Sequence, residues 1–157
     1  MTGDTLRGAL AGAAGTTALN AAGYLDMAWR GRPASDGPQD LAEQAAQRAG
    51  VPIRGDKDKR RNRLQGLGGL SGIGVGVAVG AAAGLIRGSL ARRGRSLPPA
   101  TELTLIGAVA MTLSDVPLRL LGVSDPASWT VADWVSDAIP HLFYGAVTCS
   151  VLRLGKS

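Results

Sequence analysis

The residues best suited to proton or cation chemistry lie in the last third of the chain. Asp133, Asp137 and His141 are spaced by four, so a helix over this region places them on one face. Ionisable side chains at membrane depth are costly and tend to face a bundle interior or a water-filled cavity. This spacing therefore predicts a site that could take up a proton or a cation.

Further polar residues join this face if the helix ends coincide. Asp115 and Arg119 have the same spacing on the preceding segment and can form an ion pair within one helix. The candidate polar cluster is Asp26, Asp115, Arg119, Asp133, Asp137 and His141. A plainer interpretation places Asp133 and Asp137 in headgroups or water, with Arg119 only neutralising Asp115.

The same residues match neither a metal site nor an enzyme. The chain has one histidine and one cysteine, Cys149, so it lacks the ligands of a typical zinc site and has no intrachain disulfide. Its sequence contains no phosphate-binding glycine loop, no serine nucleophile elbow and no HExxH motif. We expect no catalytic residues, no metal, no cofactor and no enzymatic activity.

Four apolar segments must position the cluster, at approximately 8–28, 64–86, 101–121 and 131–152. The clearest runs from Leu64 to Ile86 without a charge, between Arg63 and Arg87. At the helical rise this length is about 34 Å, enough to cross the hydrocarbon core with some tilt. The segments predict an all-α fold, a single domain over residues 1–157 that passes several times through the plasma membrane.

Two of these segments carry an alternative. The first has the length of a signal peptide, but Asp4 precedes it and it has no leucine-rich centre, which favours a retained helix. Pro140 lies in the fourth segment, where it either kinks one spanning helix or divides an interfacial turn from a short span. Thr130 and Asp133 have the spacing of a capping box, which predicts where this fourth helix begins.

A polar loop over residues 30–63 separates the first two segments. Within it, Asp36-Gly37-Pro38 can open a short surface helix from Gln39 to Ala49. Trp29, Trp129 and Trp134 are expected at the membrane interface on the side of this loop. The basic residues divide almost evenly between the two sides, so the orientation stays open.

Composition favours a membrane over nucleic acid. The chain has 23 glycines but only three Trp, two Tyr and one Phe, and small residues favour close helix packing in lipid. Its net charge is +5, yet the basic residues crowd the ends of the apolar segments, where they meet phospholipid headgroups. No aromatic residues interleave with them, as single-stranded nucleic acid would require. We expect no nucleic-acid partner.

A glycine occupies every fourth position through the second segment. The row comprises Gly68, Gly72, Gly76, Gly80, Gly84 and Gly88. Successive members advance by about 40° on a helix, so the row predicts a glycine zipper, a groove that another helix backbone can enter. The first segment offers a partner row, which consists of Gly8, Gly12, Thr16 and Asn20. A second copy of the chain or a larger membrane complex is the alternative partner.

Several stretches resemble a group of small actinobacterial membrane proteins without assigned function. These stretches are 11–20, Tyr24–Met27, Arg32–Ser35, Ser114–Pro117, Leu121–Pro126 and Asp137–Gly145. The His-x-x-Tyr-Gly ending of the last one is also similar to that of YagU-like inner-membrane proteins. The resemblance implies a plasma-membrane bundle and assigns no catalytic residue.

Together these patterns predict a structural or accessory membrane protein that packs through its glycine row. The alternative is a small transporter or channel that handles protons or cations at the Asp/His cluster. The first prediction depends on the glycines in register, and the second depends on charged side chains at membrane depth.

Overall fold

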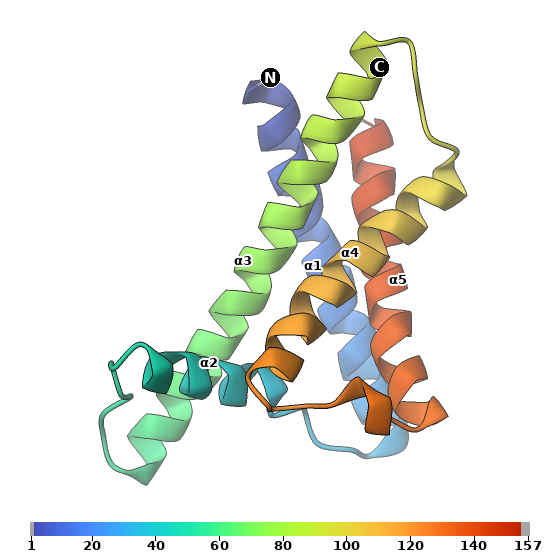
Figure 1. Cartoon of the computed structure of the whole chain (residues 1–157). Coiled ribbons are helices and arrows are strands. Elements are labelled where there is room, and N and C mark those ends of the chain that lie inside the picture. Colours follow the sequence, from blue (N-terminus) through green and yellow to red (C-terminus); the bar gives the residue numbers. More distant parts are fainter. Residues whose placement is uncertain (1, 155–157) are drawn as a thin grey trace.

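The computed structural model describes residues 2–154, which form helices and their connections without any strand. The helices are α1 (Thr2–Arg30), α2 (Gly37–Arg48), α3 (Lys57–Arg92), α4 (Pro99–Leu120) and α5 (Val131–Leu154), and a 3-10 turn, η1 (Pro126–Ser128), precedes α5. The predicted all-α class is confirmed (Figure 1).

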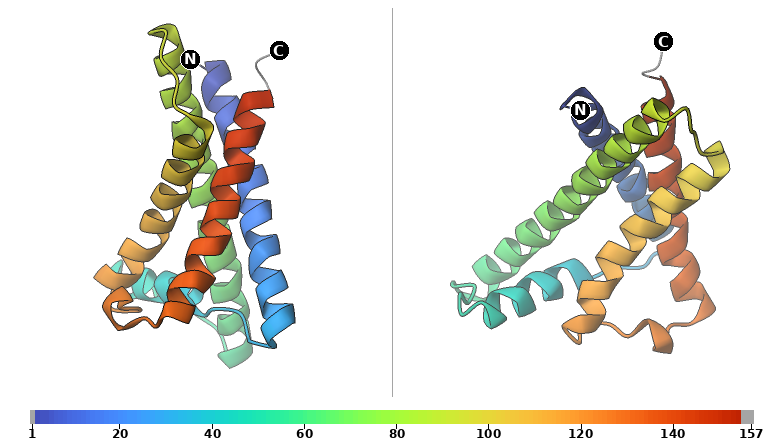
Figure 2. Two further views of the ribbon diagram at one scale, coloured as in Figure 1. Left: turned by 90° about the vertical axis from the view of Figure 1, so that its right-hand side faces the viewer. Right: turned by 45° about the horizontal axis from the view of Figure 1, so that its top comes forward.

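Four long helices run between two ends of the molecule, and α2 lies across one of these ends (Figures 1 and 2). The start of α1, the end of α5 and the 93–98 connection share one end, here called the terminal end. The opposite end holds α2, η1 and the 31–36 connection, and is here called the α2 end. Residues near the start of α4 therefore lie far from residues near the start of α5.

Each predicted apolar segment coincides with a long helix, but the helix ends differ from the prediction. α3 begins seven residues earlier than the predicted 64–86 segment, because the charged run that precedes this segment is itself helical. Its N-cap is Asp56, whose carboxylate accepts the backbone N–H of Lys59 at 2.9 Å. The same hydrogen bond holds the pKa of Asp56 below its usual range. α2 starts at Gly37, two residues before the predicted start.

α5 is one helix from Val131 to Leu154, so Pro140 does not divide it into a turn and a short span. The predicted capping box at its start is confirmed. The Asp133 carboxylate accepts the backbone N–H of Thr130 at 2.9 Å, and the Thr130 hydroxyl accepts that of Asp133 at 3.3 Å.

The core is small and lies where α1, α3, α4 and α5 meet. It consists of Ala11, Val79, Ile106, Ala110, Tyr144, Cys149 and Leu152. Tyr144 is almost fully buried, and its hydroxyl donates to the carbonyl oxygen of Gly76 at 2.6 Å. This hydrogen bond joins α5 to α3 across the centre of the bundle.

Two helices within residues 2–154, α3 and α4, are long and apolar enough to cross a membrane. Little of their apolar surface is covered by the protein: 22% of the residues in the most apolar stretch of α3 are buried, and 17% in that of α4. Large side chains such as Leu70 and Leu105 are at least half exposed. The bundle therefore presents apolar helix faces to its surroundings.

Candidate functional site

The contact between α1 and α3 has backbone, not side chains, at its centre. Gly8 and Gly12 of α1 lie against Gly76, Gly80 and Gly84 of α3. A Cβ atom added to Gly12 would lie 3.0 Å from the Cα of Gly80, and one added to Gly84 would lie 2.8 Å from the Cα of Gly8. Side chains do not tolerate such approaches to backbone atoms, so this α1–α3 seam accepts only glycine at these positions.

The other glycines of the row have different neighbours. Gly68 lies against the backbone of Pro38 at the start of α2, and Gly88 lies against the carboxylate of Asp4. Gly72 has open space around its Cα. The row therefore has four positions that face α1, one position, Gly68, that faces α2, and one open position, Gly72.

Sequence reasoning missed close contacts at three glycines outside the row. A Cβ atom on Gly145 of α5 would lie 2.9 Å from the backbone nitrogen of Gly107 on α4. One on Gly15 of α1 would lie 2.8 Å from the ring of Tyr144 on α5. These glycines belong to no four-residue repeat, so their spacing in the sequence did not predict a helix contact.

Asp115, Asp137 and His141 come together where α4 meets α5, towards the α2 end. Asp115 of α4 and Asp137 of α5 line the same pocket, and their carboxyl groups are close enough for their charges to interact. Oδ2 of Asp137 is buried and has no hydrogen-bond donor within residues 2–154. We call Asp115 and Asp137 the carboxyl pair. A proton held between the two groups would satisfy this oxygen, since two ionised carboxylates only repel each other.

His141 lies one helical turn beyond Asp137 and is buried. Its Nδ1 is 2.8 Å from the backbone oxygen of Asp137 and 3.5 Å from the Oδ1 atom of the same residue. A hydrogen on Nδ1 satisfies the backbone oxygen of Asp137. The imidazole and the carboxyl pair thus form one set of neighbouring ionisable groups.

Arg119 does not belong to this set, and the predicted ion pair between Asp115 and Arg119 is wrong. Nη1 of Arg119 lies 3.5 Å from Oδ1 of Asp125, and both of these side chains are more than half exposed. Asp115 is partly buried against α5. If Arg119 paired with the partly buried Asp115, its guanidinium would lose hydrating water. Its pair with Asp125 stays in water.

Asp26 and Asp133 also have partners of their own. Nε of Arg32 donates to Oδ2 of Asp26 at 2.5 Å, and Arg30 lies 3.6 Å from the same carboxylate. Asp133 caps α5 through Thr130. Of the six residues of the predicted polar cluster, the structure brings together Asp115, Asp137 and His141.

A polar pocket of about 410 Å³ opens beside the carboxyl pair at the α2 end. Its lining includes both carboxyl groups together with Arg30, Arg32 and Asp133. Arg30 also donates to the hydroxyl of Ser136 at 2.5 Å, which joins α1 to α5. The pocket gives the carboxyl pair a polar route to the surface.

A second buried carboxylate, Glu102, lies at the terminal end. Its side chain is 8% exposed, and Nη1 of Arg87 donates to its two oxygens at 2.7 and 2.6 Å. Nη2 of Arg153 donates to Oε2 at 2.5 Å, and the thiol of Cys149 lies 3.5 Å from that oxygen. These contacts connect α3, α4 and α5. We call Glu102, Arg87 and Arg153 the Glu102 cluster.

No role was predicted for Glu102 from the sequence. The available indication was topological. In an up-and-down bundle, the end of the second segment, the start of the third and the end of the fourth share one side. Arg87, Glu102 and Arg153 occupy these three places.

Within residues 2–154, no three His, Cys, Asp or Glu side chains gather closely enough to hold a metal ion. Comparisons with known protein families, curated proteins and solved structures find no match to the chain. The similarity to YagU-like proteins therefore stays a prediction. The features that bear on function are the seam, the two buried acidic sites and the exposed apolar surface.

Proposed function

We propose that the chain is a plasma-membrane protein with four spanning helices, α1, α3, α4 and α5, and that it serves as a structural or accessory component. The exposed apolar surface of the long helices carries this proposal. Leu70 on α3 is 66% exposed, Leu105 on α4 is 50% exposed and Phe143 on α5 is 54% exposed. In water such surface is unfavourable by about 25 cal/mol per Å², whereas hydrocarbon tails solvate it without this penalty.

The charges support the same placement. Asp4 pairs with Arg92 at 2.9 Å near the terminal end, where the Glu102 cluster also lies. At the α2 end, Trp129 and Trp134 pack edge to face with their ring centroids 5.0 Å apart. Charged and tryptophan side chains at the two ends of an apolar bundle are typical of a protein that crosses a bilayer.

The α1–α3 seam supports a structural role. Lipid offers no hydrophobic force between helices, so association depends on close backbone approach, dispersion and weak Cα–H···O contacts. A glycine zipper at Gly76, Gly80 and Gly84 supplies this approach. In this proposal the seam holds the first two spans together, and the chain provides a rigid apolar scaffold within the membrane.

Membrane fractionation tests the placement. Full-length protein should stay in the membrane pellet after washing with alkaline carbonate, because spanning helices resist this treatment. A peripheral protein held only by its basic residues would be released. Recovery of most of the chain in the wash would contradict the proposal.

A pair of glycine substitutions tests the structural role. Gly80→Leu places a side chain into the backbone of α1, whereas Gly72→Leu places the same side chain into open space. Gly80→Leu should abolish a folded, monodisperse protein in mild detergent, and Gly72→Leu should leave it intact. Equal behaviour of the two variants would show that the seam does not hold the bundle together.

The same variants address partners. Gly66, Gly69, Gly72 and Gly74 have nothing within contact distance, so α3 keeps an open small-residue surface below the seam. If a second copy or a larger complex packs there, Gly72→Leu should eliminate a crosslinked species that wild type forms in native membranes. If wild type forms no such species, the chain acts as a monomer.

The second candidate function is a small proton- or cation-handling transporter or channel. The observation that favours it is the buried Oδ2 of Asp137, which has no hydrogen-bond donor within residues 2–154. Asp137 also lines a polar pocket together with Asp115. Proton and potassium fluxes into liposomes should then fall in Asp115→Asn and His141→Ala and persist in Asp125→Asn, an exposed control. Absence of flux from wild type under every gradient would assign the carboxyl pair a structural role.

A further inference from the structure

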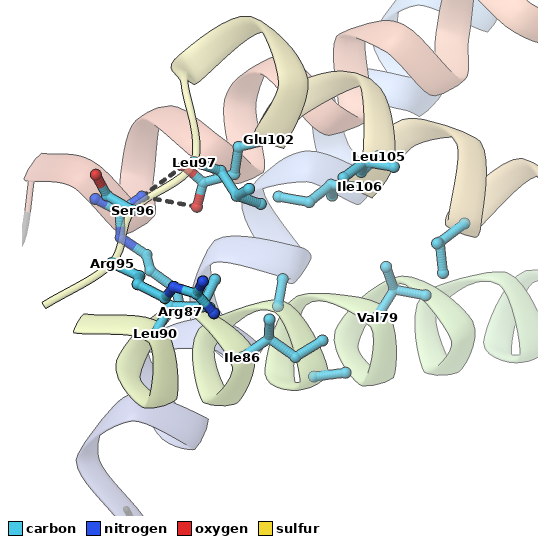
Figure 3. Close-up of a pocket in the computed structure, with 13 residues that line it drawn as sticks. Val79, Ile86, Arg87, Leu90, Arg95, Ser96, Leu97, Glu102, Leu105 and Ile106 are labelled. Carbon is cyan, nitrogen blue, oxygen red and sulfur yellow. Dashed lines mark hydrogen bonds and ion pairs between the residues drawn. The ribbon is translucent and has the colours of Figure 1, made fainter. Parts of the chain in front are cut away.

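An amphipathic pocket of about 270 Å³ lies between α3 and α4 at the terminal end (Figure 3). Val79, Leu105 and Ile106 line its apolar part, and Arg87, Arg95 and Ser96 gather at its other end. By comparison, an engineered apolar cavity of roughly 150 Å³ stays dry and binds benzene. The apolar part of this pocket therefore suits a hydrocarbon chain better than water.

The polar end of the pocket carries excess positive charge. Glu102 supplies one negative charge against the guanidinium groups of both Arg87 and Arg153. Arg95 adds a further positive charge, and its guanidinium makes no hydrogen bond or ion pair within residues 2–154. Nε of Arg87 is also buried without an acceptor. The pocket thus offers unused donors and a positive field at the mouth of an apolar chamber.

We propose that this pocket binds an anionic phospholipid, with the phosphate at Arg95 and Ser96 and one acyl chain between α3 and α4. A phospholipid combines the two chemistries that the pocket presents, a long apolar chain and a charged oxygen-rich head. Free phosphate would leave the apolar chamber empty, and a zwitterionic lipid would bring a positive group to a site that is already positive.

The geometry of the bilayer agrees with this orientation. If α3 and α4 span the membrane, as the proposed function requires, the 93–98 connection lies at the level of the headgroups. Arg95 and Ser96 then meet the phosphate, and the chamber lined by Val79 and Ile106 lies in the hydrocarbon. Basic pockets between spanning helices recognise anionic headgroups in this way.

Lipid retention by the purified full-length protein tests the proposal. The protein in mild detergent is incubated with micelles that contain phosphatidylglycerol or phosphatidylcholine, and bound lipid is counted by native mass spectrometry. Wild type should retain about fivefold more phosphatidylglycerol than phosphatidylcholine, since one arginine near a headgroup contributes about 1 kcal/mol. Inorganic phosphate at millimolar concentration should not displace the lipid.

Two matched pairs of variants locate the site. Arg95→Glu should lower phosphatidylglycerol retention at least about fivefold, whereas Arg93→Glu changes the charge equally outside the pocket and should not. Ala82→Phe fills the apolar part of the pocket and should prevent lipid retention. Ala78→Phe adds the same side chain at an exposed position of α3 outside the pocket and should leave lipid retention unchanged.

Equal retention of both lipids, equal effects within either pair of variants, or displacement by inorganic phosphate would overturn the lipid site. Carbonate washing separates this result from the proposed function. Arg95→Glu should stay in the membrane pellet even when it has lost its lipid. Wild type that leaves the pellet would instead overturn the membrane placement on which the lipid site rests.

Discussion

Each end of the bundle contains a buried carboxyl group, but the partners of these two groups differ. At the terminal end, Glu102 has two guanidinium partners, and both of its oxygens accept hydrogen bonds. At the α2 end, Asp137 faces another carboxyl group, and one of its oxygens has no donor within residues 2–154. One acid has more cations than it can neutralise, whereas the other has a histidine one turn away and no arginine within ion-pair distance in residues 2–154.

This difference separates a structural role from a functional one. A carboxylate held by two arginines from neighbouring helices stabilises one arrangement and has little reason to change its protonation. Two carboxyl groups without a strong cation are stable only when a proton or a cation joins them. The Glu102 cluster therefore fits a structural role, in which it holds three helices together. The carboxyl pair instead fits the proposed site for a proton or a cation.

The largest expected effect is at Glu102. Glu102→Gln keeps the shape of the side chain but leaves Arg87 and Arg153 without a counterion. The free energy of unfolding in detergent should fall by about 3 kcal/mol, the low end for a broken buried pair, because Arg153 is one-third exposed. Glu43→Gln on α2 is the control, since its partner Arg60 is more exposed. Similar losses in both variants would mean that the Glu102 cluster is an ordinary surface pair.

At the carboxyl pair, a substitution is expected to raise the free energy of unfolding, not to lower it. Asp137→Asn replaces one of two facing acids with an amide that can donate to Asp115, so the free energy of unfolding should rise by about 0.5–1.5 kcal/mol. Chemical unfolding in the same detergent measures this change. A loss of stability would show that Asp137 is already satisfied and that the contrast between the two ends does not hold.

A smaller effect with a defined pH dependence is expected at Asp56, an acid satisfied by backbone N–H groups at the start of α3. Its pKa in the folded protein is low, so its stabilising contribution is complete above the pKa of an unfolded aspartate, about 4. The contribution disappears as the pH falls through the lower, folded pKa. Hydrogen exchange at Lys59 should accelerate in this acidic range in wild type, and Asp56→Ala should show fast exchange at neutral pH too.

The smallest effect is expected at Arg119. Arg119→Ala removes an exposed pair with Asp125 and should change the free energy of unfolding by less than about 0.5 kcal/mol. If Arg119 neutralised Asp115 instead, its loss would alter the carboxyl pair. A stability change above about 1 kcal/mol, absent from Asp125→Ala, would restore the ion pair that the sequence suggested.

Local patterns were sufficient to predict the helices and parts of the site. An uncharged apolar run located α3, a largely apolar run located α4, and the Thr130–Asp133 spacing located the start of α5. The four-residue spacing also placed Asp137 beside His141. The early start of α3 was missed because the charged run before Leu64 forms ion pairs one turn apart, such as Asp58 with Arg61, that permit a helix.

Spacing predicted one contact between helices, the packing of Gly8, Gly12 and Thr16 on the glycine row, but other contacts were beyond these patterns. Arg119 had two acids within reach, and only the tertiary fold makes Asp125 the accessible one. The Glu102 cluster needs three helices in register, and no repeat marks the residues that meet there. Gly107 and Gly145 are isolated glycines whose contact depends on the crossing of α4 and α5.

The α1–α3 seam has a consequence for how the protein can evolve. In most helix contacts a larger residue on one side can be accommodated by a smaller one on the other, and such exchanges leave correlated pairs among related sequences. At the seam both sides are already glycine at the points of closest approach, so no smaller residue exists to compensate. We expect Gly8, Gly12, Gly80 and Gly84 to be invariant among relatives, and this contact to be invisible to methods that depend on covariation.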